Sequence, residues 1–253
     1  MGTRRQLLVL GGAAGLWVGA FRYGPDIVER FRGIGFEPHE RVSGYRRIAS
    51  EGARSAGAGF DVLTGLGRSE PLPPGLAEKV ASDPESALFD TPANGPTRIA
   101  YFFDYYCPYC RVLSEHLASL RATAEIAVTR HHWPIFGASS DLAARAVLAA
   151  GMQTDDDALH ARLMQTPIRV TPSYLEELAL AVGLSWPELE RDMQAQEVEA
   201  SLQRTRALVR LFGFVGTPAL VVGRTVVEGE IPEARLLELA RIERPEGGAG
   251  PAS

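Results

Sequence analysis

The sequence predicts an α/β domain built around a strand that runs directly into a helix opened by two cysteines. Three observations lead to this prediction. Residues 97–103 are rich in β-branched and aromatic side chains, which is typical of a buried strand. Residues 107–122 place apolar side chains at helical spacing, and residues 126–128 again favour a short strand. A strand–helix–strand series of this length implies a right-handed crossover between two parallel strands.

Cys107 and Cys110 are the only cysteines of the sequence, and Pro108 and Tyr109 separate them. Residues three apart share a face in the first turn of a helix, so the two sulfurs can reach disulfide distance. Pro108 suits that turn because its φ is close to the helical value and its missing N–H would have had no intrahelical partner. Cys107 is therefore expected where free N–H groups and the helix dipole stabilise an anion.

A thiolate at such a site is favoured, because a helix N-terminus lowers a cysteine pKa by about one to five units. Stabilising the thiolate also stabilises the dithiol, so the disulfide becomes a better oxidant. The pair therefore predicts two-electron thiol chemistry. The alternatives are a structural disulfide or half of a zinc site. Zinc needs about four ligands, and the sequence has no second C-x-x-C and no well-spaced histidine pair.

His131 and His132 follow the second predicted strand, in a segment up to Pro134 that we expect to be a loop. Adjacent residues at a strand end point in opposite directions and rarely bind one ion. We therefore expect no metal site at this histidine pair.

The composition predicts one globular domain with extra segments at each end. The chain has 253 residues, is 45% hydrophobic and carries a net charge of −5. This length is enough to bury a substantial core around a domain that holds an insertion. Because no dense Lys/Arg patch is present, we expect no nucleic-acid partner.

Residues 1–21 are predicted to be an export signal or an N-terminal anchor. Arg4 and Arg5 precede an apolar, glycine-rich stretch from Leu7 to Ala20, a pattern that resembles a twin-arginine signal. That stretch of fourteen residues is shorter than the roughly twenty that span a bilayer, which favours a cleaved signal. The alternative is an uncleaved anchor that attaches the protein to the inner membrane. Export would place the cysteines in an oxidising compartment, such as the periplasm.

The rest of the chain divides by composition. Residues 22–85 are a poorly defined extension and linker, in which glycines interrupt any long periodicity and residues 71–75 are rich in proline. A short helix is expected over residues 76–80. The catalytic domain is expected over 86–244, and the Gly/Pro-rich tail over 245–253 is expected to be disordered.

The stretch F-F-D-Y-Y-C-P-Y-C at 102–110 resembles the DsbA-like family of thioredoxin-fold thiol:disulfide oxidoreductases. Two later stretches agree: W-P-I-F-G at 133–137 resembles the entry to the family's helical insertion, and G-T-P-A-L-V-V at 216–222 resembles its cis-proline loop and following strand. The resemblance covers about residues 86–242. It implies a thioredoxin-like fold with an inserted helical subdomain at about 138–212.

Two patterns inside the expected insertion predict helix starts. They are the capping boxes Ser173-x-x-Glu176 and Ser185-x-x-Glu188, with Gly183 as the C-cap between the two helices.

The family resemblance also implies a role for each site residue. Cys107 would be the exposed nucleophile that forms a mixed disulfide with a protein substrate, and Cys110 would resolve that intermediate. The residues between them, Pro108 and Tyr109, would tune the thiolate. Thr217 and Pro218 would present backbone groups to an extended substrate strand. The alternative for Pro218 is a turn proline that opens an edge strand.

The implied partners are protein thiols and disulfides, together with a membrane or soluble redox partner that resets the pair. No organic cofactor or metal is expected, because the disulfide itself carries the electrons. Oxidation, isomerisation and reduction all remain open, since the direction depends on the potential and on the partner. The competing class is a module whose cysteines bind and deliver copper(I) or another soft metal, although no Met-rich or Cys/His-rich segment supports it.

The sequence departs from the family at one position. Relatives often have an acidic residue six positions before the first cysteine, and this chain has Tyr101 there. A neutral phenol with a pKa of about 10 cannot accept a proton near neutral pH. Asp104 is the nearest acid, and we expect it to cap the loop or the start of the helix.

Overall fold

The computed structural model describes residues 34–48, 71–122, 126–154, 156–166 and 168–245. The chain divides into two units, 1–35 and 36–253, and the strands and helices of the described residues belong to the second. The expected signal or anchor at 1–21 and the tail from 246 onward lie outside the described residues. Within the described part of the chain, no helix is both long and apolar enough to cross a membrane.

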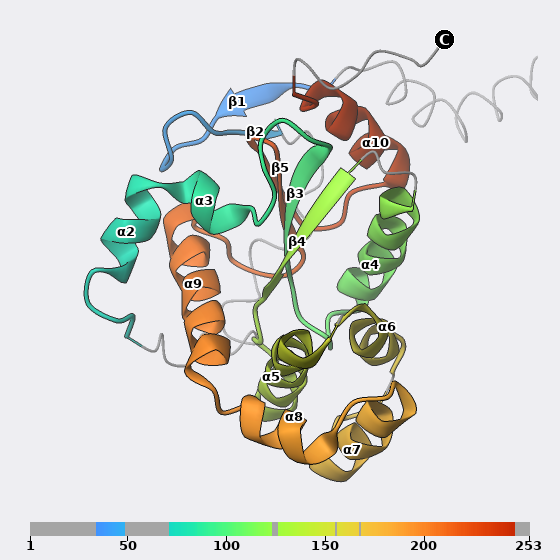
Figure 1. Ribbon diagram of the computed structural model, residues 1–253. Coiled ribbons are helices and arrows are strands. Elements are labelled where there is room, and N and C mark those ends of the chain that lie inside the picture. The colour runs from blue at the N-terminus through green and yellow to red at the C-terminus, as the bar shows by residue number, and fades with distance from the viewer. Residues whose placement is uncertain (1–33, 49–70, 123–125, 155, 167, 246–253) are drawn as a thin grey trace, which may run out of the picture. The chain divides into compact units, whose positions relative to one another are not determined.

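The second unit is a six-stranded mixed sheet in the order β1-β2-β6-β5-β3-β4, with helices on both faces (Figure 1). The elements are β1 (Phe36–Pro38), β2 (Arg46–Ile48), α2 (Leu76–Ser82), α3 (Pro84–Leu88), β3 (Thr97–Phe103), α4 (Pro108–Arg121), β4 (Ile126–His132), α5 (Ala138–Gln153), α6 (Asp157–Gln165), α7 (Pro172–Ala181), α8 (Trp186–Asp192), α9 (Gln196–Phe212), β5 (Ala219–Val222), β6 (Thr225–Glu228) and α10 (Glu233–Ile242). The predicted parallel pair is confirmed as β3 and β4, joined by α4.

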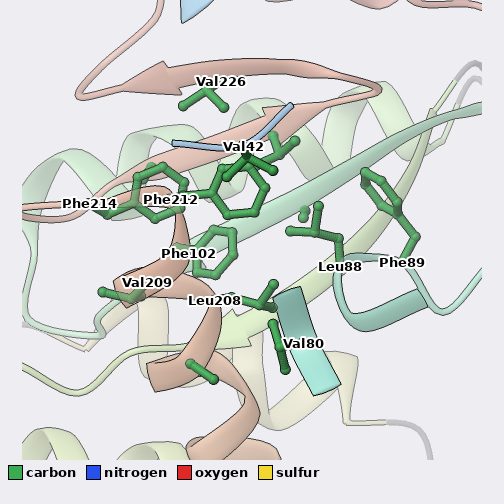
Figure 2. Packing of buried hydrophobic residues seen from close by; sticks show 14 residues of the cluster. Val42, Val80, Leu88, Phe89, Phe102, Leu208, Val209, Phe212, Phe214 and Val226 are labelled. Atoms are coloured by element: carbon green, nitrogen blue, oxygen red, sulfur yellow. The ribbon is translucent and has the colours of Figure 1, made fainter. Parts of the chain in front are cut away.

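Strand β3 lies inside the sheet, between β4 and the antiparallel β5. Its side chains alternate between the two faces, as in any strand. Phe102 packs with Leu208 and Phe212 of α9 in a buried cluster that α2 and α3 complete (Figure 2). On the other face, the Thr97 hydroxyl donates to the Ala240 carbonyl of α10 at 2.7 Å. The strand is therefore held from both sides, and its carboxyl end delivers the two cysteines.

Strand β4 is longer than expected and continues through both histidines to His132, which pairs with Phe103. The loop expected from His131 is wrong, because pairing with β3 extends the strand. His131 stacks on Phe102 at 4.5 Å between ring centroids, and its Nε2 donates to the Leu88 carbonyl at 2.9 Å. His132 packs on Phe103. The two rings therefore lie on opposite faces of the sheet, as expected.

Helices α5 to α9 follow β4 before the chain returns to the sheet at β5. The cap of α7 is Thr171, whose hydroxyl accepts a backbone N–H at 3.3 Å, so the expected cap at Ser173 is wrong. A proline after Thr171 starts the helix two residues earlier. Ser185 is the N-cap residue of α8 but makes no side-chain capping bond. Gly183 lies between the helices with φ of 81°, a conformation that favours glycine.

Residues 36–48 are part of the sheet, although the sequence analysis assigned them no structure. Strand β2 runs parallel to β6, and Arg46 binds Glu243 at 2.6 Å and the Thr225 hydroxyl at 2.9 Å. Val42 joins the buried cluster around α9. The compact unit therefore begins before the boundary expected at Ser86.

Candidate active site

The two cysteines lie at the start of α4, immediately after the carboxyl end of β3. Cys107 is the N-cap residue of the helix and Pro108 its first residue. The Cys107 sulfur accepts the Cys110 backbone N–H at 3.3 Å. The backbone N–H of Cys107 donates to the Asp104 carbonyl at 3.2 Å, which closes the turn between strand and helix. The sulfur thus replaces the usual oxygen acceptor of a helix cap.

The surroundings of the two thiols shift their pKa values in opposite directions. A hydrogen bond from the Cys110 thiol lowers the pKa of Cys107 to about 7, against the opposing effect of burial. The Thr217 side chain and the backbone N–H groups of Cys110 and Tyr109 make smaller contributions in the same direction, which are included in that value. Burial raises the pKa of Cys110, and its hydrogen bond to Cys107 adds to that rise. Near neutral pH, Cys107 can therefore be a thiolate while Cys110 stays a thiol.

Cys107 is not exposed, which corrects the expectation of an exposed nucleophile. The residue is only 2% exposed and Cys110 is fully buried. The reason is the segment before β5: the Thr217 carbonyl lies 3.3 Å from the Cys107 sulfur and accepts its S–H. A substrate must therefore approach along the Thr217–Pro218 segment to reach the sulfur.

The Thr217–Pro218 peptide bond is cis, as the resemblance to a cis-proline loop implied, and it lies beside Cys107. The Pro218 carbonyl accepts the Gly229 N–H at 2.9 Å, which fixes the segment to the end of β6. The Thr217 hydroxyl is buried and has no hydrogen bond of regular geometry among the described residues. It is close enough to Cys107 to favour the thiolate.

Tyr109 is exposed to solvent over 55% of its surface. Its contribution to the Cys107 pKa comes from its backbone N–H. The tuning expected of Tyr109 therefore depends on its position in the first helical turn, where N–H groups lack intrahelical partners.

Tyr101 lies beneath the start of α4, at the position where members of the family often have an acidic residue. Its hydroxyl donates to the Cys110 carbonyl at 2.8 Å and accepts from the Ser114 hydroxyl at 3.3 Å. Burial raises the pKa of Tyr101 well above its ordinary value. The phenol is therefore a neutral donor that ties β3 to α4.

Sequence reasoning missed several polar contacts around the site. Of the two roles expected for Asp104, capping the loop is confirmed, because its carboxylate accepts the Tyr106 N–H at 2.7 Å, whereas the helix is capped by Cys107. The contact between Asp104 and Ser140 of α5 was not expected. The guanidinium of Arg111 donates to the Tyr105 carbonyl at 3.2 Å. No spacing rule would have found these contacts, because their partners are set by the folded chain.

A third histidine near the site, His160 of α6, is partly buried and is hydrogen-bonded to the Tyr105 hydroxyl at 3.1 Å. Burial lowers the pKa of His160 to about 3. Among the described residues, no group of three or more His, Cys, Asp or Glu side chains is arranged to hold a metal ion.

Comparison with known proteins places this geometry in a family. The family model described as DSBA-like thioredoxin domain matches residues 98–240. A thioredoxin-like oxidoreductase from Silicibacter pomeroyi DSS-3 is 34% identical, with a TM-score of 0.59, over 63% of this chain and 97% of its own. A periplasmic thioredoxin-like protein from Salmonella enterica serovar Typhimurium is 26% identical, with a TM-score of 0.53, over 62% and 94%.

A more distant structure supports the fold alone. The thiol-disulfide exchange protein alpha-DsbA2 from Wolbachia pipientis is 21% identical, with a TM-score of 0.59, over 66% of this chain and 95% of its own. No curated protein matches the chain.

Proposed function

Because this chain belongs to the DSBA-like thioredoxin domain family, we propose that it is an exported thiol:disulfide oxidoreductase that exchanges disulfides with other proteins through Cys107 and Cys110. One observation supports this proposal most: Cys107 caps α4 with a lowered pKa, beside a Cys110 thiol whose pKa is raised. This arrangement gives one sulfur, Cys107, that exchanges readily with substrate and one thiol, Cys110, that stays protonated near neutral pH.

The proposed reaction starts from the disulfide between Cys107 and Cys110. A substrate thiolate attacks the Cys107 sulfur, the internal disulfide breaks, and Cys110 leaves with the electron pair and takes up a proton. A second substrate thiolate then attacks the substrate sulfur of the mixed disulfide and releases Cys107 as a thiolate. Two electrons have passed from the substrate dithiol to the cysteine pair. A redox partner that carries a disulfide oxidises the pair again.

The pKa difference favours disulfide donation over reduction. Once a mixed disulfide has formed, a low-pKa Cys107 is a good leaving group, so the second substrate thiol completes the exchange readily. Cys110, with its raised pKa, is almost entirely protonated and attacks the mixed disulfide slowly. The reverse step, which would return the substrate thiol, is therefore disfavoured.

Substrate binding in this proposal uses the segment beside the sulfurs. Thr217 precedes the cis proline and lies against Cys107. Val215, two residues before Thr217, is 57% exposed. An extended peptide can add to this backbone as a strand, which places its cysteine next to Cys107. Export rests on the twin-arginine pattern at residues 1–21 and on the periplasmic Salmonella relative.

The test uses Cys107→Ser and Cys110→Ser with a reduced, unfolded two-cysteine peptide as substrate. Oxidised wild type should convert the peptide to its disulfide, and Cys107→Ser should not. Cys110→Ser is instead mixed with the disulfide form of the same peptide: its Cys107 thiolate attacks the peptide disulfide, releases one peptide thiolate and should accumulate as a mixed disulfide, detected by mass spectrometry, because Cys110 is not there to resolve it. If Cys107→Ser traps the peptide while Cys110→Ser does not, the assigned roles are reversed.

A further inference from the structure

Asp104 is a buried carboxylate that joins three segments of the chain; the residue is 1% exposed. Its Oδ1 accepts the Tyr106 N–H at 2.7 Å, and its Oδ2 accepts the N–H groups of Ile135 at 2.7 Å and Phe136 at 3.2 Å. The Ser140 hydroxyl lies 2.6 and 2.7 Å from the two oxygens. The carboxylate thus ties the turn before Cys107 to the loop after β4 and to the first turn of α5.

These contacts occupy the hydrogen-bond acceptor positions of the carboxylate. An ionised carboxylate offers about four acceptor positions, and three backbone N–H groups and one hydroxyl face it. Hydrogen bonds to a charged acceptor are roughly twice as strong as neutral ones. Asp104 is therefore equipped to hold three backbone N–H groups in place.

We propose that Asp104 is a positioning residue that sets the reactivity of Cys107, an inference that deepens and rests on the proposed function. Two bonds to Asp104 define the turn that leads into α4: its carboxylate holds the Tyr106 N–H, and its backbone carbonyl accepts the Cys107 N–H at 3.2 Å. The same carboxylate fastens the entry of the helical segment to this turn through Ser140. Without the Asp104 carboxylate, the turn would not keep Cys107 at the N-terminus of α4.

The test compares Asp104→Asn with the matched control Ser140→Ala. Asparagine has nearly the same size as aspartate, but its side chain replaces one acceptor oxygen by an NH₂ donor. As a result, either the Tyr106 N–H or the N–H groups of residues 135–136 must face a donor instead of an acceptor. Ser140→Ala removes one buried partner and leaves all three backbone bonds. The readout is the rate of Cys107 alkylation by iodoacetamide against pH, with the modified site confirmed by mass spectrometry. Alkylation requires no disulfide exchange, so it reports on Asp104 even if the proposed function fails.

For Asp104→Asn we expect the alkylation midpoint to rise by about one pH unit, with about tenfold slower alkylation below the midpoint. The Ser140→Ala midpoint should stay at the wild-type value. An unchanged or lowered midpoint in Asp104→Asn would overturn the proposal, and a lowered one would show that the carboxylate acts through its charge. An equal shift in both variants would also overturn it, because general loosening would then explain the effect.

A measurement on the wild type decides the question if Asp104→Asn does not fold. The amide hydrogens of Tyr106, Ile135 and Phe136 should exchange as slowly as those of the sheet, because each is held by the buried carboxylate. Fast exchange at these three amides would overturn the proposal.

Discussion

Removing the Cys110 thiol should raise the pKa of Cys107, because the largest contribution that lowers this pKa is the hydrogen bond from Cys110. A hydrogen bond to a charged group contributes about 1.5 to 3 kcal/mol. At about 1.36 kcal/mol per pKa unit, its loss corresponds to a rise of about one to two units. In Cys110→Ala the Cys107 pKa should therefore rise from about 7 to about 8 to 9. Cys110→Ser keeps an O–H donor at nearly the same place, so its Cys107 pKa should stay closer to 7.

The assay is the ultraviolet absorbance of the thiolate followed against pH. Each variant has a single cysteine, so the titration belongs to Cys107 alone. Thermal unfolding of both variants checks that they remain folded. If Cys110→Ala and Cys110→Ser titrate at the same midpoint near 7, the hydrogen bond is not the cause. The backbone N–H groups at the helix start would then set the pKa by themselves.

Two further predictions concern buried groups near the site. Tyr101→Phe should lower the free energy of unfolding by about 1 kcal/mol, because the hydrogen bond to the Cys110 carbonyl is lost. The pH–rate profile of disulfide exchange should stay unchanged. If exchange became tenfold slower while the Cys107 titration stayed unaltered, the phenol would instead be identified as a proton carrier. Burial lowers the pKa of His131 to about 4, below its unfolded value of about 6.5, so the unfolded chain binds more protons between these pH values and stability falls as pH drops through this window. The variant His131→Gln retains a donor for the Leu88 carbonyl but cannot titrate in this range. Between pH 7 and pH 5, its free energy of unfolding, measured with denaturant, should fall by about 2 kcal/mol less than that of the wild type. Equal losses in the two proteins would show that His131 is not the titrating group.

Local patterns in the sequence were sufficient where local chemistry decides the structure. Strand β3 runs from Thr97 to Phe103 as predicted, because β-branched and aromatic residues are concentrated there and a turn precedes them. Helix α4 starts at Pro108 as predicted, because proline favours the first helical position. The family resemblance indicated a cis-proline loop at Thr217 and Pro218, and the structure has this cis bond beside Cys107, which is 110 residues away from Thr217 in sequence.

Contacts between distant segments could not be predicted in the same way. The burial of Cys107 depends on how closely the Thr217 carbonyl approaches, and no periodicity encodes that distance. Apart from Tyr106, the partners of the Asp104 carboxylate lie more than thirty residues away, on a loop and a helix that only the fold brings together. The end of β4 at His132 was missed because pairing with β3 extends the strand beyond its apolar residues.

The central claim is that the cysteine pair cycles between dithiol and disulfide, and its equilibrium reduction potential tests this most directly. The protein would be equilibrated in glutathione buffers of graded composition, trapped with acid and analysed by intact mass for the loss of two hydrogen atoms. We predict a single two-electron transition at a potential above about −300 mV, because structural disulfides lie below that value and a stabilised Cys107 thiolate favours the dithiol. A pair that stays oxidised to lower potentials, or that never forms the disulfide, would contradict the account.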